Sequence, residues 1–246
     1  MNDKYLLSVI TVTKNSDKHI EECIKSVIAQ KFQKLEYIII DGNSTDKTLE
    51  IVKKYRRFIN VVISEQDKGI YDAMNKGLNL AKGKFIHFLN SDDKYNNSNV
   101  LKTIFKNIKH NEIYYGKIIY LENGKKKVLG SKFELKKELI SSNVPQPSLF
   151  VPLSFYKKVG NFNDKFRIAA DYDMLLRLAR YYKINYLPIS VTVMNSGGLS
   201  YKKPFLTFFE AMKVSISNGV SIYLSLLYFI LKCVNWIIKK TLFKKI

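Results

Sequence analysis

The feature that most constrains the fold is an alternation of apolar, strand-like segments with helix-like segments over residues 1–93. The strand-like segments are 7–13, 37–40, 61–64 and 85–89. They are apolar almost throughout, which is typical of strands that are buried on both faces. Between them, apolar residues recur at helical spacing in 20–28, and further helices are predicted from after Asp46 to about Tyr55 and over 70–81. The alternation predicts an α/β fold, with a mostly parallel sheet and helices on both faces.

Each predicted strand of this first part ends in polar or acidic residues. The ends are Thr13-Lys14-Asn15, Asp41, Glu65-Gln66-Asp67 and Asn90-Ser91-Asp92-Asp93. Ligands of open parallel sheets bind outside the carboxyl ends of the strands. We therefore expect these polar clusters to converge on one edge of the sheet.

The pattern changes after Asp93. A strand is predicted over 112–121, and Asn123-Gly124 is a strong hairpin signal that leads into a strand at 127–129. Pro145-Gln146-Pro147 is expected to be extended, because a residue before proline avoids the helical region. Apolar residues at helical spacing predict a helix over 171–182.

The charge of the chain is strongly positive and unevenly distributed. The sequence has 41 Lys and Arg against 21 Asp and Glu, a formal net charge of +20. From Met174 to the end, Glu210 is the only acid, against eleven Lys or Arg. Such a field favours a polyanionic partner, which means nucleic acid, an anionic membrane surface or a phosphorylated substrate. No recognised nucleic-acid-binding module accompanies the charge, so we do not expect a nucleic-acid partner.

The last part of the chain, 204–246, reads as a basic amphipathic helical tail. Residues 222–231 are almost entirely apolar, but this run is shorter than the roughly 20 residues that a transmembrane helix needs. Trp236 and five lysines from Lys232 onward suit a helix that lies in the headgroup region of an anionic membrane. The alternative is a helix that packs on the core and has a solvated basic end.

The two cysteines, Cys23 and Cys233, lie among apolar neighbours, and the sequence has no disulfide framework and no zinc-ligand spacing. This usage fits a reducing compartment. Met1 leads into a strand-like run without a signal-peptide pattern. We therefore expect a cytoplasmic protein that lies peripherally on the inner face of the cell membrane.

The acidic pair Asp92-Asp93 is the first candidate for chemistry. Two adjacent carboxylates at the end of a buried strand are costly if they stay unpaired. Mg²⁺ or Mn²⁺ is commonly held by one or two carboxylates together with the phosphates of a substrate. The alternative is an Asx turn or an N-cap of a helix that begins near Asn97. The pair by itself does not decide between these two interpretations.

Three further positions allow both a functional and a structural interpretation. Asp41 could accept a hydrogen bond from a nucleobase, or it could belong to an ordinary helix cap. Lys68 precedes a helix and could bind phosphate, or it could be a solvated loop lysine. Asp171 could be a general base or a helix N-cap. His87 lies within a strand and is expected to be a packed core histidine.

Four ordered segments together resemble the family 2 glycosyltransferases, which have the GT-A fold. The matching segments are 8–15, 38–48, 64–77 and 81–93. The last of them resembles the subgroup that builds bacterial O-antigen, capsule or exopolysaccharide repeat units. The resemblance covers roughly the first 180 residues, and its motifs occur in the family's order and spacing. It implies a glycosyltransferase domain at 1–203, with a nucleotide-sugar-binding half at 1–93 and an acceptor-binding half at 94–203.

The resemblance also implies contacts to the nucleotide-sugar donor. The implied donor-site residues are Thr11, Thr13, Asn15, Asp41, Lys68, Asn75 and Asp92. Among them, Thr11, Thr13 and Asn15 would line the nucleotide pocket, and Asp41 would hold the base. Asp92 would face the ribose or the donor sugar.

The remaining roles follow from the same resemblance. Asp93 would bind Mn²⁺ or Mg²⁺, Asp171 would be the catalytic base, and Gln146 would contact the acceptor. The chain departs from the family's pattern at three places: Ala170 stands where many relatives have Glu, Met74 where many have Arg, and Pro145 where many have His.

These implications give one expected function and two alternatives. The expected function is that of an inverting, hexosyltransferase-like enzyme that moves a sugar from a nucleotide-sugar to a polyprenyl-diphosphate-linked glycan. The expected nucleotide-sugar is a UDP-sugar. One base and a metal suffice for this reaction, whereas a glycosidase needs two carboxylates that flank the bond. The alternatives are a nucleic-acid-binding protein, on the strength of the charge, and a sugar nucleotidyltransferase. The latter would need a Gly-rich lysine signature, which the first strand end lacks.

Overall fold

The structure, a computed structural model, describes residues 4–122 and 124–243. The described strands are β1 (Leu7–Thr13), β2 (Leu35–Asp41), β3 (Val61–Ser64), β4 (Phe85–Phe88), β5 (Asp93–Tyr95), β6 (Ile113–Glu122), β7 (Lys125–Leu129), β8 (Leu149–Pro152) and β9 (Ile184–Asn195). The helices are α1 (Ile20–Ile28), α2 (Thr48–Lys54), α3 (Ile70–Leu80), α4 (Val100–Asn107), α5 (Leu135–Glu138), α6 (Leu153–Val159), α7 (Ala170–Ala179), α8 (Leu199–Lys202), α9 (Pro204–Ser217) and α10 (Ile222–Phe243). Two 3₁₀ turns, η1 (Arg56–Phe58) and η2 (Gln146–Ser148), complete the described elements.

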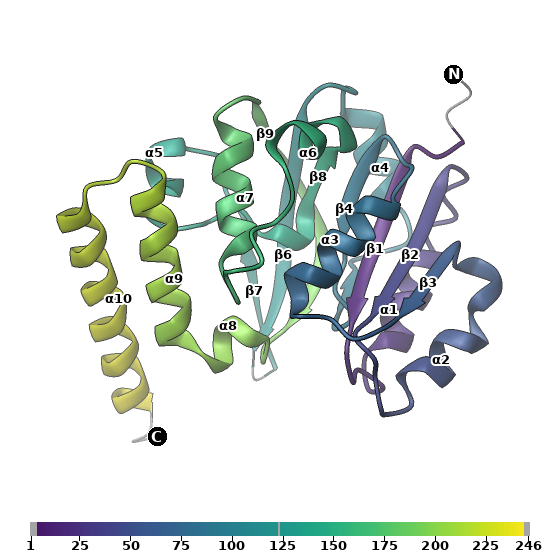
Figure 1. The fold of residues 1–246 in the computed structure, drawn as a ribbon, viewed down its shortest axis with the longest axis horizontal. Helices are drawn as coiled ribbons and strands as arrows, with labels where there is room; N and C mark the ends of the chain where they lie inside the picture. The colour runs from purple at the N-terminus through teal and green to yellow at the C-terminus, as the bar shows by residue number, and fades with distance from the viewer. Residues whose placement is uncertain (1–3, 123, 244–246) are drawn as a thin grey trace.

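The described strands form one curved sheet in the order β3-β2-β1-β4-β8-β6-β9-β5, with β7 paired to β6 (Figure 1). The first four strands are parallel, as the sequence predicts. Their register places Thr13 opposite Asp41, and Asp41 opposite Ser64. The polar strand ends of β1, β2 and β3 therefore do meet at one edge, and this part of the prediction is confirmed.

Helices cover both faces of this parallel part. Alternate residues of the strands point to opposite faces, because the side-chain period of a strand is two. Ile10 and Ile40 pack toward α3, whereas Val9 and Ile39 pack toward α1. A helix close to the sheet needs a small residue at the contact, and α3 has Gly77 there. A Cβ atom on Gly77 would lie 2.4 Å from Cγ2 of Ile10.

The second part of the sheet mixes parallel and antiparallel pairs. β8 runs antiparallel to β4 and to β6, and β6 runs parallel to β9. Glu122 pairs with Lys125, which confirms the predicted hairpin, although Asn123 lies outside the described residues. The expected extended segment at Pro145-Gln146-Pro147 is wrong for Gln146, which begins the 3₁₀ turn η2. The Ser148 side chain and backbone N–H both donate to the Pro145 carbonyl and so hold this turn.

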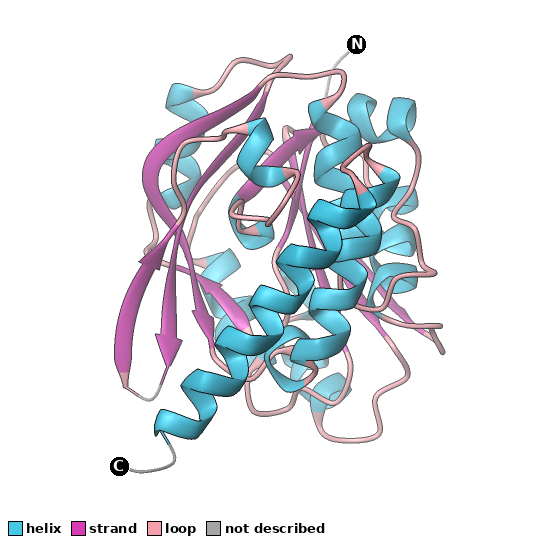
Figure 2. Ribbon diagram, turned by 90° about the vertical axis from the view of Figure 1, so that its left-hand side faces the viewer, coloured by secondary structure: helices cyan, strands magenta, loops and turns pink. Residues whose placement is uncertain are grey.

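The C-terminal helices α9 and α10 form an antiparallel pair beside the sheet (Figure 1 and Figure 2). Val214 of α9 is completely buried in a cluster with Ala169, Tyr172 and Leu176 around α7. α10 in turn packs on α9 through ring contacts, among them Phe205 with Trp236. Because α9 shares a core with α7, we place the end of the globular domain after α9 and not at residue 203.

The apolar run at 222–231 is only the first part of a longer helix, α10. α10 continues through Lys232 to Phe243, and its segment Ile222–Thr241 is the one described helix that is long and apolar enough to cross a membrane. The prediction that this helix is too short to cross a membrane is therefore wrong. Its outer face is exposed, as Tyr223, Leu227 and Ile237 show, so the alternative of a core-packed helix does not hold for most of α10.

Candidate functional site

Asp41 occupies the end of β2, between the ends of β1 and β3. Its carboxylate is completely buried and accepts hydrogen bonds from the Ser44 backbone N–H (2.9 Å), the Ser44 hydroxyl and the Ser64 hydroxyl (2.7 Å). Asp41 does not cap a helix. The next helix, α2, begins at Thr48, and the Thr48 backbone N–H donates to the Asp46 side chain. Asp41 thus holds together two loops at the edge where a base could bind.

The loop after β1 is fixed to the loop after β2 by Asn15. Its backbone is in the left-handed region (φ 50°), and its side-chain oxygen accepts from the Thr45 N–H at 2.8 Å. Thr13 lies next to this loop, and its hydroxyl is buried without a hydrogen-bond partner. Thr11 is placed differently from the expectation. Its hydroxyl faces Tyr37 (3.2 Å) in the core, so its side chain does not line the strand-end pocket.

Asp93 begins β5 and has a carboxylate oxygen that lacks a partner. The side chain is 2% exposed, and Oδ2 makes no hydrogen bond. Burial, and then the charge of the adjacent Asp92, raise the pKa of Asp93 well above its usual value. The nearby Asn90 has a second buried oxygen, Oδ1, that also lacks a partner. The N-cap of α4 is Asn99, so the alternative role of the acidic pair as a helix cap is wrong.

Two unsatisfied oxygen acceptors beside a second carboxylate fit a hard divalent cation, which takes oxygen ligands. Within the part of the chain that the structure describes, no group of three or more His, Cys, Asp or Glu could complete a cage. The donor set therefore suits Mg²⁺ or Mn²⁺ that shares its coordination with the phosphates of a substrate. Asp93 and Asp92 are the residues that would hold the ion.

Lys68 lies two residues before α3, and Asn75 lies in the middle of this helix. Asn75 makes two hydrogen bonds to the backbone of Phe162, one donated and one accepted, each at 2.9 Å. The Asn75 side chain therefore binds the loop that contains Phe162 and is not free to contact a nucleotide-sugar. Lys68 is exposed and lines a cavity of about 300 Å³ together with Arg167 and Lys203. The sequence did not indicate these last two cations, because they come from separate segments and belong to no local motif.

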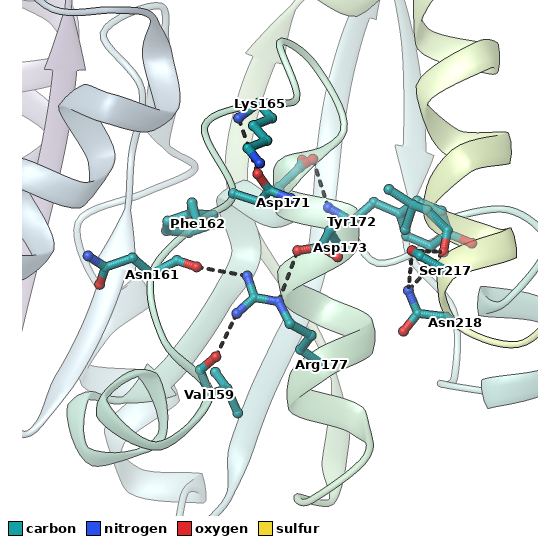
Figure 3. A network of polar contacts seen from close by, with 12 residues as sticks. Val159, Asn161, Phe162, Lys165, Asp171, Tyr172, Asp173, Arg177, Ser217 and Asn218 are labelled. Atoms are coloured by element: carbon teal, nitrogen blue, oxygen red, sulfur yellow. Dashed lines mark hydrogen bonds and ion pairs between the residues drawn. The ribbon is translucent and has the colours of Figure 1, made fainter.

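Asp171 is the second residue of α7 and lies partly buried at the start of the helix (Figure 3). Its Oδ1 accepts from the Tyr71 hydroxyl (3.1 Å) and from the Tyr172 N–H (2.8 Å), so it also contributes to the cap of its own helix. Burial is the main reason that its pKa is raised. A carboxylate with a raised pKa is a better proton acceptor than an ordinary one. This placement is suited to a general base.

The segment before α7 is held by a carboxylate from the C-terminal helices. Glu210 of α9 is 6% exposed, and its two oxygens accept from the backbone N–H groups of Arg167 (2.9 and 3.1 Å), Ile168 (2.8 Å) and Ala169 (3.0 Å). The Ile168 carbonyl accepts from the same Tyr71 hydroxyl that contacts Asp171. Only the isolation of Glu210 in a basic region could have indicated this clamp from the sequence.

Arg177 holds the other side of α7 (Figure 3). It pairs with Asp173 (2.9 Å) and donates to the carbonyls of Val159 (2.7 Å) and Asn161 (2.8 Å). Asp173 is thus engaged in the scaffold and does not act with Asp171 as a carboxylate pair.

Two other predicted positions lie near β8. His87 is confirmed as a core residue: it is completely buried and stacks on Phe150 at 4.4 Å between ring centroids. Gln146 is partly buried in η2, next in the chain to Pro147, whose carbonyl His87 contacts. No described contact joins Gln146 to Asp171.

Comparison with known proteins gives one consistent family. The family model "Glycosyl transferase family 2" matches residues 8–167. A PGL/p-HBAD biosynthesis glycosyltransferase of Mycobacterium bovis is 26% identical over 230 residues, which cover 90% of this chain and 89% of the relative. The putative teichuronic acid biosynthesis glycosyltransferase TuaG of Bacillus subtilis is 39% identical over 106 residues, 42% of each chain.

Solved structures show the same fold. S. aureus TarS 1–349 in complex with UDP-GlcNAc has a TM-score of 0.70 and 23% identity, over 91% of this chain and 70% of that one. The match to a longer TarS chain covers 89% of this chain but only 41% of the TarS chain. The mannosyltransferase PcManGT of Pyrobaculum calidifontis, in complex with GDP-Man and Mn²⁺, has a TM-score of 0.67 and 16% identity, over 93% of this chain and 74% of that one. The fold is therefore GT-A-like, as the sequence predicts.

Proposed function

Because this chain belongs to glycosyl transferase family 2, we propose that it is an inverting enzyme that transfers a sugar from a UDP-sugar to a hydroxyl of a lipid-linked glycan. The observation that carries the proposal is the partly buried carboxylate of Asp171, which lines a cavity, accepts a hydrogen bond from Tyr71 of α3 and has a pKa that burial raises. Family membership decides against a nucleic-acid-binding protein and a sugar nucleotidyltransferase.

The proposed donor site is the edge formed by the ends of the parallel strands. Asp41, Thr13 and Asn15 fix the loops there and would bind the nucleotide. The unpartnered Asp93 oxygen and the neighbouring Asp92 support a metal-dependent diphosphate site. A divalent cation, when bound, would neutralise the charge of the diphosphate leaving group. The neighbours that bind UDP-GlcNAc or GDP-Man with Mn²⁺ support a nucleotide-sugar donor.

In the proposed reaction Asp171 accepts the proton of the acceptor hydroxyl. The oxygen of that hydroxyl forms a bond to the anomeric carbon as the bond from this carbon to the diphosphate oxygen breaks. The nucleoside diphosphate leaves with the electron pair, and the configuration at the anomeric carbon inverts. Tyr71 donates to Asp171 and keeps the carboxylate oriented toward the acceptor.

The product is proposed to be a cell-surface polysaccharide of the O-antigen or capsule type. The teichuronic acid relative supports a cell-surface glycan. The exposed apolar face of α10, with Lys232, Lys239 and Lys240, supports binding to the anionic inner face of the cell membrane, where a polyprenyl-diphosphate carrier would be met.

The proposal is tested with Asp171→Asn and with Glu50→Gln as a control at an exposed carboxylate. We expect Asp171→Asn to lower the rate of transfer by about 10²- to 10⁴-fold, because a general base contributes that much. UDP binding with Mn²⁺, measured by calorimetry, should stay unchanged in both variants. An Asp171→Asn enzyme that transfers sugar at the wild-type rate would show that this residue is not the base.

A further inference from the structure

A cavity of about 370 Å³ lies between the start of α7, the turn at 140–142 and the helices α9 and α10. This volume is in the range of about 300–1,000 Å³ that is usual for small-molecule sites. Asp171 lines the cavity, so the proposed base faces a space that the C-terminal helices enclose. The donor-site carboxylates Asp41, Asp92 and Asp93 do not line it.

We propose that this cavity binds the acceptor, and that the acceptor is an amphiphile whose hydroxyl-bearing end lies at Asp171 and whose apolar chain lies between α9 and α10. The proposal rests on the function proposed above and adds the place where the acceptor and its lipid chain bind. The helices that contact the membrane are then part of the substrate site itself.

An unpartnered hydroxyl inside the cavity points to a bound molecule. Ser225 is the polar residue in the apolar stretch of α10, it is 4% exposed, and its Oγ has no hydrogen-bond partner. A buried hydroxyl without a partner costs free energy, whereas an alanine of nearly the same size would not. Thr207 of α9 and Ser141 of the turn at 140–142 also bring hydroxyl groups to the cavity lining. This composition suits an acceptor that brings its own hydrogen-bonding groups.

A cation at the cavity wall suits an anionic linker in the acceptor. Lys232 of α10 lines the cavity and donates to the Ser141 hydroxyl at 3.1 Å. No carboxylate within the described part of the chain forms an ion pair with it at salt-bridge distance. A phosphate that joins a sugar to a lipid would supply the missing negative charge.

Apolar side chains line the cavity and are also exposed on the same helix, α10. Phe208 and Phe229 line the cavity beside Ser225. On the outer side of α10, Leu226 and Ile230 are about half exposed. A lipid chain that leaves the cavity between the helices therefore meets an apolar surface, and bilayer lipid could cover that surface at the same time.

The test measures binding of decyl phosphate below its micellar concentration to the full chain by calorimetry. Ser225→Phe fills the cavity, and Leu231→Phe adds the same ring to an exposed position of the same helix. We expect Ser225→Phe to weaken binding by about tenfold or more, since overpacking removes the space for the ligand. Leu231→Phe should bind as the wild type does. Equal binding by the two variants would place the probe on the outer surface and overturn the proposal.

Two further measurements separate the parts of the proposal. Lys232→Gln should weaken decyl phosphate by about tenfold but leave decyl glucoside unchanged, because only a charged ligand gains from the ammonium group. Lys239→Gln is the matched control. If Ser225→Phe fails to fold, Ser225→Cys in a Cys233→Ser background replaces it: decyl phosphate should slow maleimide labelling of Cys at 225, and no protection would contradict the proposal. UDP binding is measured in parallel, so failure of the donor site is seen separately.

Discussion

Glu210 determines the position of the proposed base through three backbone N–H groups. The Glu210→Gln change leaves an amide NH₂ facing N–H donors, because only one side-chain oxygen remains to accept. We expect a loss of about 1–3 kcal/mol in the free energy of unfolding and a lower kcat. Glu134→Gln, in an exposed ion pair with Lys137, is the control and should change the free energy of unfolding by under about 1 kcal/mol.

The pH dependence of the rate distinguishes a role of Glu210 at the proposed base from a role in the stability of the fold alone. Its negative charge is among the causes that raise the pKa of Asp171, after burial. A raised pKa means that the base is protonated, and the rate falls, at a higher pH. Glu210→Gln should therefore shift the acidic limb of the pH–rate profile to lower pH. A limb that stays in place would assign Glu210 a purely structural role.

His87 makes the stability of the fold depend on pH. Burial lowers its pKa to about 4, and its Nε2–H donates to the Pro147 carbonyl at 3.0 Å in the neutral form. The folded state thus binds a proton less readily than the unfolded state, whose histidine titrates near 6.5. Stability from the neutral imidazole is complete above about pH 6.5 and is lost as the pH falls toward 4, by up to about 3 kcal/mol.

Urea unfolding at pH 7.5 and at pH 5 checks this expectation. His87→Phe should unfold more easily at both values, yet lose less stability between them than the wild type. His110→Gln, at an exposed histidine, should keep the wild-type difference. If His87→Phe and the wild type lose the same free energy between the two pH values, other groups cause the pH dependence.

At the scale of elements, the Cys233 thiol of α10 can report whether this helix contacts a membrane. Cys23 is completely buried and its pKa is raised to about 12, so it should not react in the folded protein. Cys233, on α10, is partly exposed. A water-soluble maleimide should therefore label one thiol in buffer. Anionic vesicles should slow this labelling by about tenfold or more, whereas neutral vesicles should not, because lysines attract anionic lipid.

Unfolded protein, in which both thiols react, is the reference for complete labelling. Labelling of Cys233 at the same rate with and without anionic vesicles would contradict the membrane role of α10. The measurement does not remove the helix, so the cavity at Asp171 remains intact while it is made.

The predictability of the elements follows from how local their signals are. β1 to β4 and the helices between them are visible in the sequence, because each carries its own apolar period. β5 has three residues, too few for any period, and it exists because Asp93–Tyr95 pairs with β9 about a hundred residues later. The place of α9 in the core is likewise set by distant residues of α7. The predicted domain boundary at residue 203 rested on the change in composition there, which does not reveal this packing.

The same distinction holds for the site. Asp171 and Asp93 stand within local motifs. The structure buries Asp171 in part and leaves a buried oxygen of Asp93 without a partner, which suits their predicted roles. Thr11 was misplaced because it lies two residues before the end of β1, a strand that is buried throughout, and its hydroxyl faces Tyr37 there and not the edge of the sheet. Glu210, Arg167 and Lys203 could not be found from the sequence, since their contacts join segments that only the fold brings together.

At the scale of the whole molecule, the clasp between Asn75 and Phe162 ties the half that would hold the nucleotide to the half that would hold the acceptor. The sheet also runs without interruption from β4 to β8 across the same border. A hinge motion between two halves joined in this way would have to break these hydrogen bonds and the strand pair. We therefore expect spent nucleotide to leave through rearrangement of surface loops, so that turnover is set by small local motions within an otherwise fixed body.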